Sequence, residues 1–367
     1  MSNFPDALAA TLSRHVELSN DRRQTLVTLI VGLLTARTVN LSHLAAAFCG
    51  PAQLASNYRR LQRFFQYVRL DGNWLAKVVV ALLRLAPPYQ LCLDRTEWKV
   101  GRKHLNLLVL CIAAQRVRIP ILWHILDRAG CSSMAQRQAL IERFMTLFGK
   151  ASIKLLLADR EFIGKQWFEF LVENDIPFVI RVHRNLIVRL DDGYVGPLER
   201  LALNRATRNR LINAKGCFHD MAERFTGSLA FAAVNLADGD ILIVATNRNP
   251  RKGLSSYRKR WQIECLFGDT KTRGFNMEDT KLTNPAKLSL LLAIIALAMA
   301  WAHACAVAVK GPHDIARATH GYRRKSWFRT GFDCLRHWIA THPEHAISLW
   351  TKIWARPPKR LSTARVV

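Results

Sequence analysis

The feature that most constrains this chain is one long apolar segment. Residues 288–309 read LSLLLAIIALAMAWAHACAVAV and carry no formal charge at neutral pH. By length the segment could span a bilayer, or it could form a helix buried on most sides inside a folded core. It is rich in alanine, contains Ser289 and His303, and is the only segment of its kind in the sequence. We therefore expect a core helix, with His303 as a packing residue and no membrane partner.

The chain carries a large excess of positive charge. Its 54 Lys and Arg residues against 27 Asp and Glu give +27 over 367 residues, half of which are hydrophobic. This apolar content predicts a packed core, and the length suits one large domain or two to three smaller ones. The charge indicates a polyanionic partner: DNA, RNA or an anionic membrane surface. A membrane anchor at 288–309 would leave the basic surface unexplained.

Cysteine usage and the first residues of the chain indicate a reducing compartment. The eight cysteines include no C-x-x-C pair, and several lie in apolar runs, where a thiol behaves as a small hydrophobic group. The twelve histidines are scattered without a metal-like spacing. The N-terminal sequence has no charged leader followed by an apolar core, so no secretory signal is expected. We expect reduced cysteines, no zinc site and a cytoplasmic protein.

The first 85 residues are predicted to be helical and to bind DNA. A helix capped by Ser56 carries cations interleaved with aromatic residues. The cations are Arg59, Arg60, Arg63 and Arg69, and the aromatic residues are Phe64, Phe65 and Tyr67. This pattern suits a helix with one face in a core and the other on phosphate groups, with an ordinary solvated basic face as the alternative. The basic charge of the whole chain favours DNA contact.

The pattern changes after Pro87-Pro88. Apolar strand-like runs and amphipathic helical runs alternate, which is typical of a mixed sheet with helices packed on it. Strands are predicted at 89–94, 104–114, 117–126, 153–159 and 176–182, and helices at 132–149 and 161–174. This is also the order of elements expected of a ribonuclease-H-like core. We therefore predict an α/β fold with a ribonuclease-H-like mixed sheet and flanking helices.

The remaining segments complete the predicted organisation. Residues 183 to about 249 hold short apolar pieces among Gly, Asn and Asp turns and predict a β-rich insertion. A helical pattern resumes at Ser255 and runs to about Arg273. The last segment is helical, basic and rich in tryptophan; Trp327, Trp338 and Trp350 are candidates for a dimer surface, with core packing as the alternative. We thus expect a helical DNA-binding region at 1–85, a ribonuclease-H-like domain at 86–310 and a helical C-terminal region at 311–367.

Two aspartates lie where apolar strands are predicted to end. Asp94 follows YQLCL and Asp159 follows IKLLLA. An acidic residue at the carboxyl end of a buried strand points into the crevice where α/β proteins bind ligands, although each aspartate alone could equally be a turn residue. Two of them on different strands indicate a shared site, because paired carboxylates hold hard divalent cations through oxygen. Glu97 and Glu161 are near enough in sequence to reach such a site.

A more specific pattern lies in the segment SYRKRWQIECLFGDTK. It reads Tyr257-x2-Arg260-x3-Glu264-x6-Lys271. At about 100° per residue these side chains would stand at roughly 0°, 300°, 340° and 320° around one helix. A carboxylate flanked by cations and a phenol on one stripe suits the binding of a metal together with a phosphate. A solvated basic face is the alternative.

These residues resemble the insertion sequence 4 family of DDE transposases. The spacing of Tyr257, Arg260, Glu264 and Lys271 is similar to the YREK signature of that family. Asp94-Arg-Thr-Glu-Trp98 resembles the D-x-T-x-W pattern at its first catalytic position, and Asp159-Arg-Glu-Phe162 resembles its D-R-E-F. A β-rich insertion between the second aspartate and the glutamate is also expected of the family. The resemblance covers roughly residues 40–310.

The resemblance implies two Mg²⁺ ions, which Mn²⁺ can replace, and cut-and-paste movement of a DNA element. Asp94, Asp159 and Glu264 would be catalytic residues and metal ligands. Tyr257, Arg260 and Lys271 would contact DNA phosphates. The implied partners are duplex DNA, namely terminal inverted repeats and a target, and a second copy of the chain in a synaptic homodimer. The implied location is the cytoplasm of a bacterium, at the nucleoid.

One feature departs from the family pattern. Relatives that form DNA hairpins flip a base onto a tryptophan of the β insertion. Residues 183–249 contain no tryptophan. Phe218, Phe225 or Phe231 could replace it, as could Trp261 beside Arg260. Cleavage is therefore predicted more firmly than the hairpin step.

Three other interpretations stand beside a transposase. A related metal-dependent nuclease would cut DNA without joining it to a target. An inactive DNA-binding relic agrees less well with a sequence in which all three carboxylates and the YREK pattern are intact. A protein anchored by residues 288–309 would stay with membranes after a high-salt wash, whereas salt releases a protein held by phosphate contacts.

Overall fold

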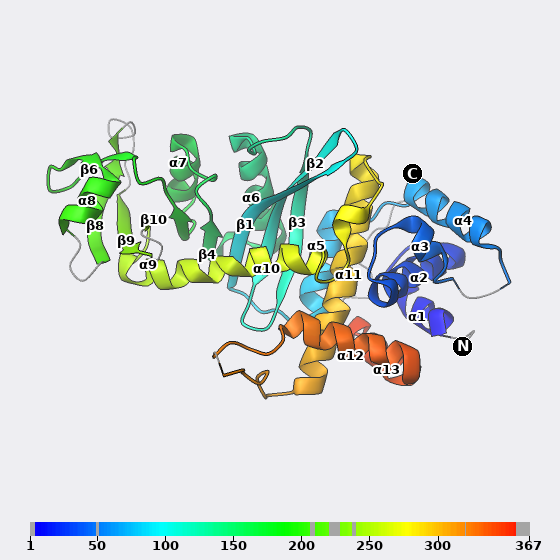
Figure 1. Cartoon of the computed structure of the whole chain (residues 1–367). Helices are drawn as coiled ribbons and strands as arrows, with labels where there is room; N and C mark the ends of the chain where they lie inside the picture. Colours follow the sequence, from blue (N-terminus) through cyan, green and yellow to red (C-terminus); the bar gives the residue numbers. More distant parts are fainter. Residues whose placement is uncertain are drawn as a thin grey trace.

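A computed structural model of the chain describes residues 4–48, 51–205, 210–219, 228–236, 240–319 and 321–356. The molecule is elongated, with a β-rich part at one end and the N-terminal helices at the other (Figure 1). One mixed sheet of ten strands, in the order β3-β2-β1-β4-β5-β10-β9-β8-β6-β7, runs through it. This is the predicted α/β class.

Five helices precede the sheet. They are α1 (Phe4–Leu12), α2 (Asn20–Ala36), α3 (Leu41–Ala45), α4 (Leu54–Tyr67) and α5 (Gly72–Leu82). The helical prediction for this segment is confirmed, but the predicted cap of α4 is wrong. Gln53 is the N-cap residue, and Ser56 lies inside the helix because its backbone N–H already donates to the Gln53 carbonyl at 3.0 Å.

The first five strands form the half of the sheet for which a ribonuclease-H-like core is predicted. They are β1 (Tyr89–Val100), β2 (Lys103–Ala113), β3 (Arg118–Leu126), β4 (Ile153–Ala158) and β5 (Phe178–Arg181). Strands β1, β2 and β3 are antiparallel neighbours, whereas β1, β4 and β5 are parallel. Parallel neighbours need crossover helices. These are α6 (Met134–Phe148), which a Ser133–Gln136 capping box starts, and α7 (Lys165–Glu173).

The insertion continues the same sheet instead of folding apart from it. It contains β6 (Ile187–Leu190), β7 (Val195–Pro197), α8 (Leu198–Arg205), β8 (Arg210–Phe218), β9 (Leu229–Asn235) and β10 (Ile241–Thr246). Strand β10 pairs antiparallel with β5, which joins the two halves. The β-rich character predicted for the insertion is confirmed.

Helices dominate the rest of the chain. They are α9 (Pro250–Tyr257), α10 (Trp261–Thr270), α11 (Pro285–Lys310), α12 (Trp327–Thr341) and α13 (Pro343–Trp354), and the 3-10 turn η3 (Arg258–Arg260) separates α9 from α10. Further 3-10 turns are η1 (Lys150–Ser152) and η4 (Met277–Asp279). Helix α9 begins five residues before the predicted Ser255, because the Asn249 side chain accepts the Arg251 N–H and Pro250 fits the first helical position.

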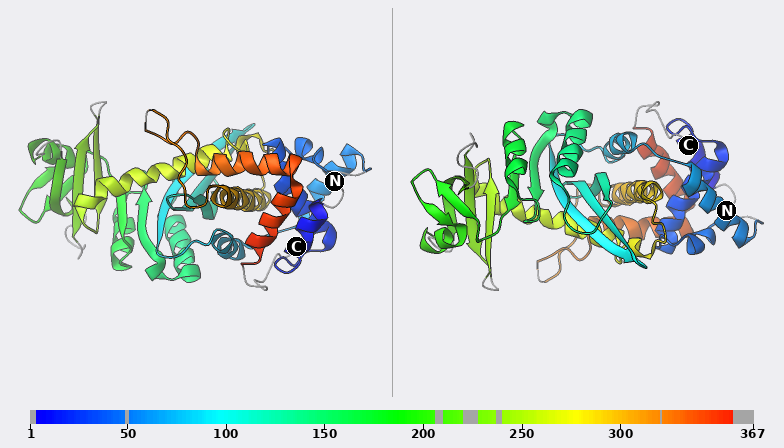
Figure 2. Two further views of the ribbon diagram at one scale, coloured as in Figure 1. Left: turned by 90° about the horizontal axis from the view of Figure 1, so that it is seen from below. Right: turned by 90° about the horizontal axis from the view of Figure 1, so that it is seen from above.

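Helix α11 contains the long apolar segment, and the fold buries it. The helix is long and apolar enough to cross a membrane, yet 94% of its most hydrophobic window is buried inside the protein. It packs against α2, α5, α12, α13 and β3, and Figure 2 shows it end-on among them. Burial lowers the pKa of His303 to about 3, so the neutral ring donates its Nε2–H to the Arg118 carbonyl at 3.1 Å. The predicted core helix is confirmed.

Substitution of Gly331 tests the close packing of α12 on α11. A Cβ atom at Gly331 would lie 1.8 Å from the carbonyl oxygen of Ala302, so the helices would have to separate. For Gly331→Ala we expect a loss of about 1–3 kcal/mol of unfolding free energy, measured by urea denaturation. Gly253→Ala in α9 is the control, because its Cβ would meet no atom closer than 3.5 Å. There, helix propensity predicts a gain of about 0.5–1 kcal/mol. Equal effects in both variants would contradict the packing argument.

Candidate active site

The register of β1 against β4 brings the two predicted aspartates together. Leu93 and Ala158 are the last paired residues of these parallel strands, and Asp94 and Asp159 follow them directly. The prediction that Asp94 ends its strand is wrong, because β1 continues to Val100 by pairing with β2, where Asp94 lies opposite Val109. The strand that ends next to Asp94 is β4, whose last residue, Ala158, pairs with Leu93. The two carboxylates therefore emerge side by side where the parallel pairing stops.

The third acidic residue comes from α10. Tyr257 ends α9, Arg260 is the last of the three residues of the 3-10 turn that follows, and Glu264 lies four residues beyond Arg260 in α10. A spacing of three in a 3-10 turn and four in an α-helix keeps side chains on one face. Helix α10 packs against β1 and the 3-10 turn packs against β4, so the run from α9 to α10 crosses these two strands (Figure 1).

Arg260 is the centre of the cluster. Its Nη1 donates to Asp94 Oδ2 at 3.1 Å, and its Nη2 lies 4.0 Å from Asp159 Oδ2 and donates to Glu264 Oε1. Tyr257 donates its hydroxyl to Asp159 Oδ1 at 3.1 Å and lies against the Arg260 guanidinium. The structure thus brings together all three predicted carboxylates and two of their four predicted DNA-binding neighbours.

Restricted solvent access shifts the protonation equilibria of this cluster. Burial raises the pKa of Asp94 from 3.8 to about 7, opposed by the Arg95 backbone N–H and Arg260, while the charges of Glu161 and Asp159 raise it further. Burial also raises the pKa of Tyr257, which keeps its phenol protonated. Burial alone would lower the pKa of Arg260, but Tyr257, Asp159 and Asp94 raise it overall. The cluster concentrates negative charge around one permanent cation.

A buried ion pair fixes α10 on the sheet. Arg118, at the start of β3, donates from Nε and Nη2 to Asp269 Oδ2, at 2.7 Å in both cases. The Arg118 carbonyl also accepts the hydrogen bond from His303 of α11. One residue of the sheet therefore connects two helices, and the position of Glu264 depends on the anchored α10.

Lys271 does not belong to the cluster around Arg260. Helix α10 ends at Thr270, and the backbone of Lys271 is not helical. The predicted stripe assumed an unbroken helix, so its angle for Lys271 is wrong. The ammonium group instead forms an ion pair with Glu278 at 2.8 Å.

Two further acidic residues surround Arg95. Its Nη1 donates to Glu97 Oε2 at 2.7 Å, and its Nε lies 3.4 Å from Glu161 Oε2. The Glu97 side chain is 48% exposed and the Glu161 side chain only 23%. Glu161 is therefore the more enclosed of the two residues that the sequence placed near the site.

The four aromatic candidates for base stacking differ in accessibility. Trp261, the first residue of α10, is 61% exposed and follows Arg260 directly. Phe218 and Phe231 are buried in the insertion with their rings packed 5.7 Å apart, so neither can receive a base. Phe225 lies outside the described residues.

The basic face of α4 is only partly available to a partner. Arg59 and Arg63 are exposed, whereas Phe64 and Phe65 are buried, as predicted for an amphipathic helix. Arg60 is held inside the N-terminal region, where its Nε donates to Thr25 Oγ1 at 2.8 Å and its Nη2 to the Asp21 carbonyl at 2.9 Å.

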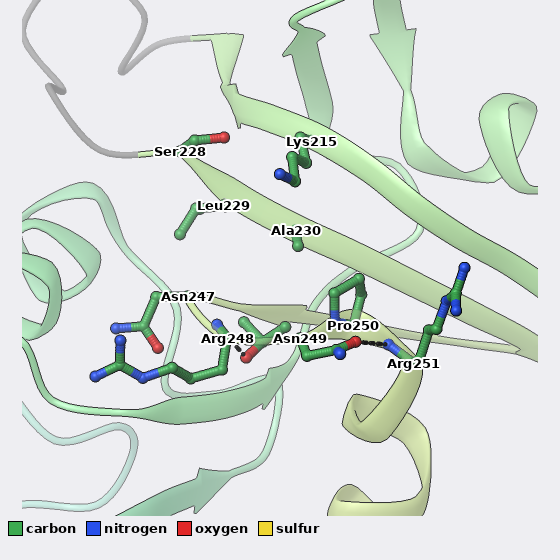
Figure 3. A pocket seen from close by; sticks show the side chains of 10 residues that line it. Lys215, Ser228, Leu229, Ala230, Asn247, Arg248, Asn249, Pro250 and Arg251 are labelled. Carbon is green, nitrogen blue, oxygen red and sulfur yellow. Dashed lines mark hydrogen bonds between the residues drawn. The ribbon is translucent and has the colours of Figure 1, made fainter.

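Two features outside the carboxylate cluster were missed from the sequence. A cavity of about 480 Å³ between the insertion and the start of α9 is lined by Lys215, Arg248 and Arg251, and none of its lining residues among those that the structure describes is acidic (Figure 3). The sequence marks these residues only as part of its general basic excess. The ligand atoms of the exposed His342, Glu344 and His345 also lie within 4.8 Å of one another at the corner of α12 and α13. The spacing H-x-E-H was the signal for this second group.

Comparisons with known proteins identify one family. The family described as transposase DDE domain matches residues 86–301. Among curated proteins, no match was found. A solved structure of the piggyBac transposase synaptic complex with hairpin DNA is similar at 12% identity and a TM-score of 0.42, over 99% of this chain and 83% of that one.

Replacement of Arg260 tests its role as the cation of the cluster. We expect Arg260→Gln to lower the unfolding free energy by about 3 kcal/mol at pH 8 in EDTA, because three enclosed carboxylates lose their counter-charge. Lys271→Gln is the control; it removes a cation from an ion pair whose glutamate is 40% exposed, so at most about 1 kcal/mol is at stake. Urea denaturation measures both, and a loss for Lys271→Gln as large as that for Arg260→Gln would contradict the assignment.

Proposed function

Since this chain belongs to the transposase DDE domain family, we propose that Asp94, Asp159 and Glu264 are the catalytic carboxylates of a DNA transposase. The observation that carries the proposal is the convergence of all three on the Arg260 guanidinium. They come from β1, from the end of β4 and from α10, segments far apart in the sequence. Within the family, the spacing of Tyr257, Arg260, Glu264 and Lys271 favours the insertion sequence 4 group.

The donor set fits hard divalent cations, for which we propose Mg²⁺, with Mn²⁺ as a substitute. All three ligands are carboxylates, and their oxygens already gather around one positive charge. Asp94 and Asp159 would hold two ions between them, with Glu264 completing one. When bound, such ions lower the pKa of a coordinated water and stabilise the leaving oxygen of a phosphodiester.

The neighbouring side chains are suited to hold the DNA backbone. Arg260 provides a planar donor that matches two phosphate oxygens, and Tyr257 provides a phenol held protonated beside it. Their present contacts with carboxylates would give way to phosphate contacts when metal ions neutralise the cluster. Lys271 would contact a backbone phosphate further along the DNA.

The rest of the basic surface supports a duplex DNA partner. Arg59 and Arg63 project from α4, and the cavity beside the insertion offers Lys215 and Arg251, whereas Arg248 is paired with Asp175 at 2.8 Å. Arg60 would act mainly through the position it gives α4, because its guanidinium is engaged. We propose that these surfaces bind the terminal inverted repeats of an element and its target, in the bacterial cytoplasm, and that the 3′ ends are joined to the target.

A homodimer is part of this proposal, since two element ends must be brought together. Trp327 and Trp350 are buried within one protomer, so they pack the core instead of forming the contact. Trp338 is half-buried on α12 against His345. The outer face of α12 and α13 is therefore the part of the C-terminal region that remains suited to dimer contacts.

Cleavage of a duplex carrying the DNA that flanks this gene tests the proposal. We expect the wild type to cut at the element end with Mg²⁺, and Glu264→Gln to bind the same duplex but to cut at least about a hundredfold more slowly, because it loses a metal ligand. Glu142→Gln, on the exposed face of α6, is the control and should cut like the wild type. Binding without cleavage by all three proteins would refute the catalytic assignment. Cleavage without joining would identify a metal-dependent nuclease.

Trp261 is proposed to stack a flipped base during hairpin formation, since it is the exposed aromatic residue beside Arg260. Stacking on an aromatic side chain contributes about 1–3 kcal/mol per base. We expect Trp261→Ala to lower the ratio of hairpin to nicked product about tenfold, and Trp261→Phe to recover part of it. Denaturing gels of end-labelled duplex measure this ratio. An unchanged ratio in Trp261→Ala would exclude the role.

A further inference from the structure

The exposed face of α4 carries two glutamines whose side chains are not engaged within the protein. Gln62 and Gln66 are both exposed and lie one helical turn apart. Neither side-chain amide forms a hydrogen bond with another residue that the structure describes. A glutamine amide presents an acceptor and two donors in one plane. These two amides are therefore available to a partner that offers a donor and an acceptor side by side.

The opposite face of α4 fixes the direction in which these amides point. Leu61, Phe64 and Phe65 are buried in the core. Arg60 ties the helix to α2, because its Nε donates to Thr25 Oγ1 at 2.8 Å. Helix α4 also packs against α3 and α11. The glutamines are thus presented by a helix held in one orientation, as recognition of a fixed pattern of donors and acceptors requires.

Hollows lie on both sides of this exposed face. One of about 440 Å³ is lined by Gln62 and Gln66, and one of about 580 Å³ is lined by residues at the start of α2. Arg63 and Tyr67 line both hollows, so α4 stands between them as a ridge. An α-helix with its side chains is about 10–12 Å across, and the major groove of DNA is about 12 Å wide. The ridge therefore has a shape that fits a major groove, with space beside it for the DNA backbone.

The charges on the ridge and in the smaller hollow also suit DNA. Helix α4 contains no acidic residue, and Arg59 and Arg63 are exposed on it. The smaller hollow is lined in addition by Lys281, which precedes α11, and by Lys287 in its first turn, and its lining residues in the described part of the chain include no acidic one. The larger hollow contains Asp21. Cations without a nearby carboxylate suit a phosphate backbone, which assigns the backbone to the smaller hollow.

We propose that α4 lies in the major groove of the element end and reads two base pairs through Gln62 and Gln66, while Lys281 and Lys287 hold the adjacent phosphate backbone. The proposal rests on the proposed function, in which this face of α4 binds the terminal inverted repeats. A glutamine amide matches the N6 donor and N7 acceptor of adenine. The two glutamines are about 6 Å apart along the helix axis, close to two base-pair steps of about 3.4 Å each. We therefore expect the recognised sequence to contain two A·T pairs about two steps apart.

Selection of bound duplexes from a random pool by the full chain tests the reading of bases. We expect the wild type to enrich one motif, and Gln62→Ala and Gln66→Ala each to lose about tenfold preference at one base pair while the other positions keep theirs. Gln62→Arg should change the preferred base at its position from adenine to guanine, because arginine matches the O6 and N7 acceptors of guanine. Gln166→Ala, on the exposed face of α7, is the control and should enrich the wild-type motif. An unchanged motif in all three α4 variants would overturn the proposal.

The salt dependence of binding tests the two lysines. We expect Lys281→Gln and Lys287→Gln each to weaken binding to all sequences alike and to reduce the slope of log affinity against log salt concentration by about 1, since each variant loses one phosphate contact. Lys77→Gln, exposed on α5, is the control and should keep the wild-type slope. A wild-type slope in both lysine variants would overturn their assignment to the backbone.

Two outcomes separate this inference from the proposed function. A wild type that enriches no motif but cleaves at the element end with Mg²⁺ would overturn base reading by α4 and leave the transposase assignment standing. A wild type that enriches a motif dependent on Gln62 and Gln66 but cleaves no DNA would support base reading by α4 and contradict the catalytic assignment.

Discussion

The contact of one guanidinium with three carboxylates is the interaction on which the rest of the site depends. Two like charges about 4 Å apart near a protein surface repel by about 4 kcal/mol, so Asp94, Asp159 and Glu264 can all be ionised in a small volume when a cation lies between them. In this structure Arg260 provides it. Each carboxylate is positioned by a different element. The register of β1 against β4 positions the two aspartates, and the packing of α10 on the sheet positions Glu264.

That support comes from the interior of the protein. Arg118 holds α10 through Asp269 and holds α11 through its carbonyl group, so the helix that carries Glu264 and the long apolar helix share one attachment to β3. Helix α11 in turn packs on α2, α5, α12 and α13. The N-terminal and C-terminal helices therefore stabilise the active site without contributing a carboxylate to it.

Local patterns were sufficient to predict much of this. The apolar runs before Asp94 and Asp159, the spacing of Tyr257, Arg260 and Glu264, and the charge-free run at 288–309 each report on a short stretch of chain, and the structure agrees with the elements they predicted.

The errors arose where a distant contact decides the outcome. Strand β1 continues past Asp94 because β2 pairs with it, α10 ends before Lys271, and Phe218 and Phe231 are buried by packing on each other. That β10 would pair with β5 depends on residues some sixty positions apart, which no local period reveals.

This last pairing has a consequence for how such a protein can change over evolution. The chain leaves the core after Arg181 and returns through Val244, and these two residues face each other across neighbouring antiparallel strands. Everything between them is bounded by two adjacent points, so its length can grow, shrink or be exchanged without moving α9 and α10. A lineage can therefore replace this segment while the carboxylates keep their places. The same adjacency makes the segment a natural place to graft a foreign domain.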